Sequence, residues 1–124
     1  MDKERLYDAF GELLYAVALA DGMIQPEEIN KIEQVLANHS WGREIEWSFN
    51  YEKNKNNDPK QVYEKALDTL KQHGPDPEYT FLIEILEEVA RASDGIDESE
   101  DKVISDMQSS LKMHFIQQVE DMKL

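Results

Sequence analysis

Two copies of one helix-turn-helix pattern constrain the fold of this 124-residue chain more than any other feature. In each copy an apolar segment runs into Asp-Gly and an acidic segment follows, as residues 16–29 (AVALADGMIQPEEI) and 89–101 (VARASDGIDESED) show. Asp21 and Asp94 are 73 residues apart (94 − 21), and at that spacing Leu13 corresponds to Leu86. The repeat therefore covers the preceding apolar faces as well as the turns.

The first copy predicts two helices joined by a short turn. Gly22 tolerates a left-handed backbone after a helix end, and the short side chain of Asp21 can bond to nearby amides. Pro26 suits the first turn of the next helix, which should end at about Asn38. Apolar residues at three-and-four spacing give both helices a buried face: Leu6, Ala9, Phe10, Leu13, Leu14, Val17, Ala20, Ile29, Ile32, Val35 and Leu36.

Two later segments each begin a helix with Asp-Pro, at Asp58 and at Asp76, because Asp caps a helix and Pro fits its first position. Gly74 and Pro75 end the first of these helices. A last helix follows the second Asp-Gly pair to the C-terminus. The apolar positions of the three helices are Val62, Ala66, Leu67, Leu70, Phe81, Leu82, Ile85, Leu86, Val89, Val103, Ile104, Met107, Leu111, Phe115 and Val119.

The segment 39–57 is rich in aromatic residues, including Trp41, Trp47 and Tyr51. It predicts a short helix around residues 43–49, with aromatic side chains that either cap the open end of the helical core or cover a pocket. Residues 53–58 are polar and predict an exposed loop.

We therefore expect an all-α fold, a compact bundle of five to six helices with room for a seventh. It should form a single domain over residues 1–124, with repeat one at about 3–38, a middle insert at about 39–75 and repeat two at about 76–122. Because a helix pair cannot bury its apolar stripe alone, the two repeats are expected to face each other.

Composition restricts the environment and the partners. The net charge of −14 disfavours nucleic acid and anionic lipid surfaces and favours cations or basic partners, although acidic surfaces also serve solubility alone. The chain has no cysteine, which fits a reducing compartment, and we expect a cytoplasmic protein. No apolar run is long enough for an integral membrane segment, and no signal peptide is recognisable.

The Asp-Gly turns are the candidate functional sites. Residues 21–28 reproduce the second half of a calcium-binding EF-hand loop, but Val17 and Leu19 stand where its first oxygen ligands should be. The alternative is that Asp21 and Asp94 only cap sharp turns in which Gly22 and Gly95 supply the backbone freedom. Candidate ligands for a divalent cation are Asp21, Glu27, Glu28, Asp94, Asp97 and Glu100.

Nothing in the sequence favours an enzyme. His39, His73 and His114 lack metal-ligand spacing and are interpreted as surface or helix-end residues, and no glycine-rich phosphate loop is present. Methionines in the last helix could offer an adaptable partner groove, although such residues also fill cores.

The doubled Ala/Ser-Asp-Gly pattern, read here as residues 20–27 and 93–100, resembles the TerB-like family: tellurite resistance protein TerB and the related N-terminal region of DjlA-type co-chaperones. The resemblance covers almost the whole chain. It implies an all-helical, non-enzymatic bacterial protein of tellurite resistance and wider chemical stress responses, in which the acidic turns bind a metal or dock a partner. No His-Pro-Asp signature is present, which argues against a co-chaperone.

The resemblance also implies action alongside membrane-associated and calcium-binding Ter proteins, so peripheral association with a membrane complex is one expectation. By the motif match, Asp21, Gly22, Glu27 or Glu28, Asp94, Gly95 and Glu100 would carry the binding role. Our functional prediction is a module that presents acidic surfaces to a protein partner or a cation. The alternative is a divalent-metal-binding sensor or buffer that uses the paired turns.

Overall fold

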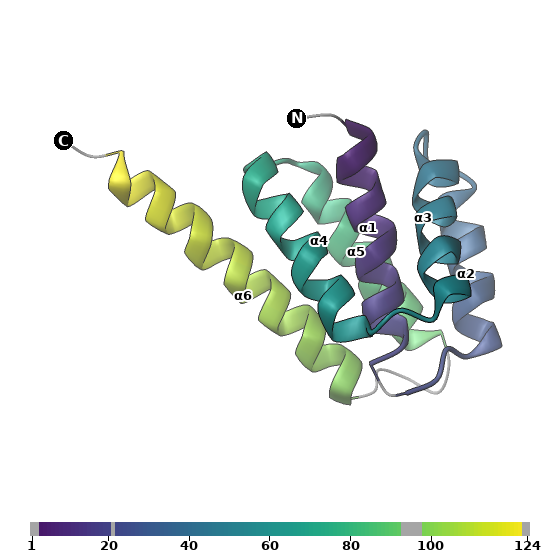
Figure 1. Cartoon of the computed structure of the whole chain (residues 1–124). Coiled ribbons are helices and arrows are strands. Elements are labelled where there is room, and N and C mark those ends of the chain that lie inside the picture. Colours follow the sequence, from purple (N-terminus) through teal and green to yellow (C-terminus); the bar gives the residue numbers. More distant parts are fainter. Residues whose placement is uncertain (1–2, 21, 93–97, 123–124) are drawn as a thin grey trace.

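The computed structural model describes residues 3–20, 22–92 and 98–122, and over this range it contains helices and no strand (Figure 1). This confirms the predicted all-α class. The helices are α1 (Lys3–Ala18), α2 (Pro26–Leu36), α3 (Gly42–Lys55), α4 (Pro59–His73), α5 (Glu78–Arg91) and α6 (Glu98–Asp121).

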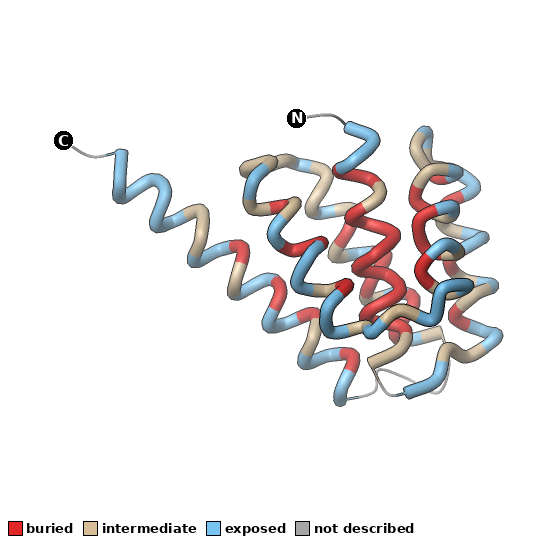
Figure 2. The backbone as a smooth tube through the Cα atoms, viewed as in Figure 1, coloured by how far each residue is buried: buried red, intermediate tan, exposed pale blue. Residues whose placement is uncertain are grey.

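Helix α1 is the centre of the bundle. It is buried on almost every side from Leu6 to Ala18, as the red tube in Figure 2 shows, because Ala, Leu and aromatic residues occupy its whole circumference rather than one stripe. Its largest contacts are with α3 and α4, and it also touches α5 and α6. The two repeats do meet, through α1 and α2 against α5, but helices of the middle insert contribute most of the cover of α1.

The close approach of α1 to α3 depends on Gly11. A Cβ atom at this position would collide with the main-chain oxygen of Ile45 and lie 2.7 Å from the Cβ atom of Ser48. The Ser48 hydroxyl also donates a hydrogen bond of 2.6 Å to the carbonyl oxygen of Asp8. A glycine that weakens an isolated helix is therefore used here to bring two helices into contact.

The helix predicted for the middle segment, around residues 43–49, is shorter than the helix in the structure. Helix α3 runs from Gly42 to Lys55, and the loop expected over residues 53–58 shrinks to residues 56–58, where Asn56 has a φ of 53°. Sequence patterns underestimated the helix because its polar outer face resembles a loop, whereas Ile45 and Phe49 anchor the inner face in the core.

The aromatic residues of this segment do not act together. Trp41 is half-buried and stacks on Tyr7 with ring centroids 5.0 Å apart, so this residue does cover the core. Trp47 and Tyr51 are exposed on the outer face of α3 and stack on each other. Helix α3 presents one face to the core and the opposite face to solvent. Trp47 and Tyr51 lie on the solvent face, so the capping role predicted for them is wrong.

The histidines are less exposed than the sequence predicted. His39 has a side chain that is only 14% exposed; its Nε2 lies 2.8 Å from Oε1 of Glu78, and its ring stacks on Phe81. His73 does end α4 as expected, and its Nε2 lies 2.8 Å from Oδ2 of Asp76. Each histidine links two parts of the chain through a contact with a carboxylate. This polar contact allows the histidine side chain to be largely buried.

For helix α6, the sequence pattern assigned one residue to the wrong face. Val119, assigned to its apolar face, is 59% exposed, whereas Ile104, Met107 and Leu111 are buried as predicted. The helix leaves the rest of the bundle towards its C-terminal end, as Figure 1 shows in yellow, so later apolar residues have nothing to pack against.

Candidate site at the acidic turns

The first turn begins where α1 ends. The amide of Gly22 donates to the carbonyl oxygen of Leu19 at 2.9 Å, and Gly22 has a φ of 96°. An added Cβ atom would meet nothing within 4 Å, so the constraint on this residue is its backbone conformation alone. Asp21, the candidate ligand beside it, lies outside the described residues.

The two glutamates that open α2 have different environments. Glu27 is exposed, whereas Glu28 is completely buried. The main-chain amide of Gln25 donates a hydrogen bond of 2.8 Å to Oε1 of Glu28. Glu28 therefore folds back to stabilise the start of its own helix, as in a capping box, and Glu27 is the member of the pair that solvent can reach.

The second turn has a matching feature. Glu100 is the third residue of α6, as Glu28 is of α2, and its side chain is 1% exposed. The repeat thus places a buried glutamate as the third residue of the helix after each Asp-Gly pair, six residues after Gly22 and five residues after Gly95. Asp94, Gly95 and Asp97 lie outside the described residues.

One groove is lined by residues from both repeats. It lies between α2 and α5, has a volume of about 550 Å³, and we call it the α2–α5 groove. Glu27 from the first repeat lines it together with Ala92, the residue just before the second turn segment. The residues around it are Glu27, Asn30, Lys31, Gln34, Glu88, Arg91 and Ala92. Its walls carry both acidic and basic side chains.

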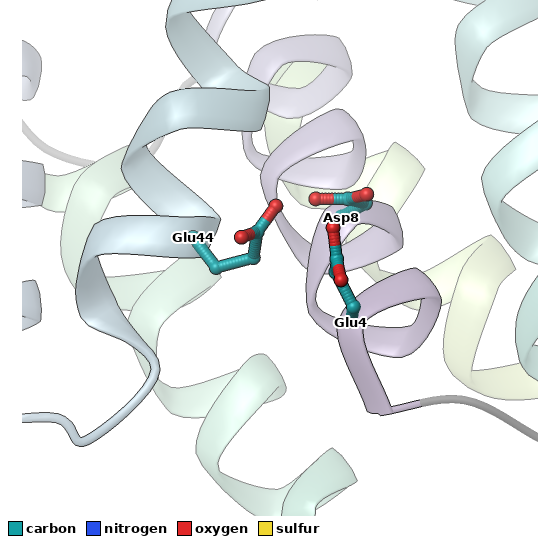
Figure 3. A group of neighbouring side chains, drawn as sticks. All are labelled: Glu4, Asp8 and Glu44. Atoms are coloured by element: carbon teal, nitrogen blue, oxygen red, sulfur yellow. The ribbon is translucent and has the colours of Figure 1, made fainter.

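A carboxylate cluster that the sequence analysis did not predict lies between α1 and α3. Within the described ranges, one group of acidic side chains places a ligand atom from each of three residues within 4.8 Å of the others: Glu4, Asp8 and Glu44. Figure 3 shows Glu44 reaching from α3 towards the two residues of α1. Glu4 and Asp8 are one helical turn apart, which was the available signal, but only the packing of α3 brings in Glu44.

This cluster changes the acidity of Asp8. Partial burial, a hydrogen bond with Glu44 and the charges of the surrounding carboxylates raise the pKa of Asp8 to about 7. Carboxylates held this close repel one another, so one of them retains a proton near neutral pH. Asp8 therefore keeps its proton to a higher pH than an ordinary aspartate does, beside the carboxylate of Glu44.

A third acidic group is structural. Nζ of Lys65 on α4 lies 2.5 Å from Oε2 of Glu12 and 3.6 Å from Oε1 of Glu52, which links α1, α3 and α4. The side-chain amide of Asn57 donates to the other oxygen of Glu52 at 2.7 Å. Burial raises the pKa of Glu12, and the hydrogen bond to Glu12 raises the pKa of Lys65. The sequence analysis missed these buried charges because an isolated Glu in a helix is typical of a solvent-facing residue.

The comparisons with known proteins decide the family. The family model described as Tellurite resistance protein TerB matches residues 8–119, which include both Asp-Gly turns. The chain belongs to this family. Its membership confirms the resemblance inferred from the doubled motif. The searches of curated proteins and of solved structures returned no match.

In this member of the TerB family, the six candidate metal ligands do not share one environment. Glu28 and Glu100 are buried at helix starts, Glu27 borders the α2–α5 groove, and the three aspartates lie outside the described residues. None of the helices, over the described ranges, combines the length and apolar character that a membrane crossing requires.

Proposed function

We propose that this TerB-family protein is a non-enzymatic binding module of a bacterial chemical stress response, with tellurite resistance as the first phenotype to test. The observation that carries the proposal is that Glu27 and Ala92, one from each repeat, line the same groove. The partner is a protein segment that lies in the α2–α5 groove and places basic side chains near the acidic turns.

The charges of the groove suit a protein segment better than a small anion. Glu27 and Glu88 stand beside Lys31 and Arg91 on its walls. Such a mixed surface selects a partner by complementary pairing, while the net charge of −14 attracts basic partners over a longer range. We also propose a cytoplasmic location. A chain without cysteine forms no disulfide and therefore does not require an oxidising compartment.

A pull-down from the native host tests the docking surface. The wild-type chain is compared with Glu27→Lys, with the double variant Asp21→Asn and Asp94→Asn, and with Glu64→Lys as a control, because Glu64 is an exposed acid on α4 outside the groove. We expect Glu27→Lys to lose the partner and the control to keep it. Equal capture by all variants would contradict the groove as the docking site.

A divalent cation is the alternative ligand, favoured by the exposure of Glu27 beside the acidic turn segment. Calorimetry and melting curves with calcium, magnesium, manganese and zinc test it, because a ligand that binds only the folded state must raise the melting temperature. Binding that disappears in the Asp21→Asn and Asp94→Asn double variant would support a sensor or buffer. An unchanged melting temperature at millimolar metal would exclude one.

Complementation tests the biological role. A host strain that lacks the protein should become sensitive to tellurite and recover with the wild-type gene. If Glu27→Lys fails to restore resistance while Glu64→Lys succeeds, the groove is required for that role. Full resistance of the deletion strain would remove tellurite from the proposal and leave the binding function to be tested by the pull-down alone.

A further inference from the structure

Helix α6 carries a second apolar stripe that the bundle does not cover. Met113, Ile116 and Val119 are 67%, 46% and 59% exposed and follow one another at intervals of three residues. Met107, which is fully buried, is nine residues before Ile116, or two and a half turns, so the two lie on opposite sides of the helix. We call Met113, Ile116 and Val119 the outer stripe of α6.

The surroundings leave the outer stripe accessible. Phe115 is the last aromatic contact between α6 and the bundle, stacking on Tyr79 of α5 with ring centroids 6.2 Å apart. Residues 116–122 are all exposed, and Figures 1 and 2 show this part of the helix extending away from the other five. An exposed apolar stripe on a projecting helix marks an interaction surface.

The charges beside the stripe identify its occupant. Lys112 lies four residues before Ile116 and Glu120 four residues after it, so the two flank the stripe symmetrically and with opposite charge, and both are exposed. In an antiparallel pair of identical helices centred on Ile116, each Lys112 lies opposite the partner copy's Glu120, and each Met113 lies opposite the partner copy's Val119. The surface is complementary to itself, as a two-fold symmetric interface requires.

We propose that two copies of this chain associate through the outer stripe of α6 in an antiparallel pair, with Ile116 at the two-fold axis and Lys112 beside the partner copy's Glu120. The inference does not depend on the proposed function of the α2–α5 groove.

The net charge of −14 does not oppose this arrangement. The described residues 109–122 contain one lysine and two acids, so the overlapping segments carry little of the total charge. Antiparallel pairing also places the two bundles at opposite ends of the helix pair. Met107, which is buried against the bundle, lies on the side of α6 opposite Ile116, so the helix pair also stands between the two bundles.

Sedimentation velocity on the full chain tests the proposal. Between about 10 μM and about 1 mM we expect the wild type to shift from monomer to dimer, as a small single-helix interface should dissociate in this range. Ile116→Glu should weaken association at least tenfold, because it brings two carboxylates together at the axis. Gln118→Glu is the matched control, since it adds the same charge to the same exposed helix but on the side away from Ile116. A wild type that stays monomeric throughout, or a control as defective as Ile116→Glu, would overturn the proposal.

Charge reversal gives a sharper test of the register. Lys112→Glu alone and Glu120→Lys alone should each weaken the dimer, because like charges then meet across the pair. The double variant should restore it, and circular dichroism should show that all three remain folded. If the double variant associates no better than the single ones, the antiparallel register is wrong.

A cross-link can then locate the axis, because the natural chain has no cysteine. Under a mild oxidant Ile116→Cys should form a disulfide-linked dimer efficiently, since the position faces itself, whereas Gln118→Cys should not. Equal cross-linking of both variants would contradict the proposed interface.

Discussion

Glu28 and Glu100 occupy equivalent positions in the two repeats, each as the third residue of the helix that follows an Asp-Gly pair, and both side chains are buried. Oε1 of Glu28 accepts a hydrogen bond from the amide of Gln25, the residue just before its helix. The internal repeat therefore preserves a buried glutamate in the first turn of the following helix, in addition to the acidic character of the turn.

Replacing Glu28 should destabilise the fold. The Gln25 amide would lose its hydrogen-bond acceptor, and the packing of the buried glutamate side chain would be lost. We expect Glu28→Ala to lower the free energy of unfolding by about 1 kcal/mol, the usual effect of removing a helix cap. Urea denaturation measures the loss, with the exposed Glu27→Ala as the matched control. Equal stability of the two variants would show that burial of Glu28 contributes nothing to folding.

Gly22 should resist substitution through its backbone alone. Gly22→Val places a β-branched residue at a φ of 96°, which should cost about 1 to 3 kcal/mol although the space around the residue is open. Gly22→Asn should cost less, because asparagine adopts positive φ more readily. Thermal melting of both variants checks the order, and an unchanged melting temperature for Gly22→Val would refute the assigned backbone conformation.

Asp8 should make stability depend on pH. Its pKa is raised to about 7 in the folded protein, compared with about 4 in an unfolded chain, so the folded state binds more protons between these values. Stability should fall as pH rises from about 4 to about 7 and lose no more through this group above that range. We expect a contribution of no more than about 1 kcal/mol, because the side chain is partly exposed and screened.

Asp8→Asn isolates this contribution. The difference in unfolding free energy between the variant and the wild type should grow in favour of the variant between pH 5 and pH 7.5, and the change should shrink at high salt. Glu64→Gln, an exposed acid on α4, serves as the control. A difference between Asp8→Asn and the wild type that stays constant with pH would contradict the raised pKa of Asp8.

Lys65 should matter more than its exposure suggests, because it neutralises two buried carboxylates. Lys65→Met keeps most of the aliphatic packing but leaves Glu12 and Glu52 without a cation, and we expect a loss of about 1 to 3 kcal/mol. Adding Glu12→Gln should recover part of it by removing one of the charges. Denaturation of the single and double variants gives the comparison, and a double variant less stable than Lys65→Met would contradict this explanation.

Local patterns in the sequence predicted the elements that depend on neighbouring residues. The starts at Pro26 and Pro59 and the end of α4 at His73 follow from Pro and Gly chemistry that acts within one turn. The structure corrected the predictions for segments whose local sequence fits two different structures equally well. The polar outer face of α3 resembles a loop, and Val119 has the spacing of a buried residue but lies beyond the end of the bundle.

The sequence by itself determined the all-helical class, the repeat and the family, because periodicity and turn residues act over short separations along the chain. Only the tertiary structure decided that the middle insert provides most of the cover of α1, that Glu44 meets Asp8, and that Glu27 shares a groove with Ala92. These relationships join residues that are distant in sequence, and they depend on how complete helix faces pack. The acidic turns remain the candidate site, but Glu28 and Glu100 are buried in the first turns of the helices that follow them.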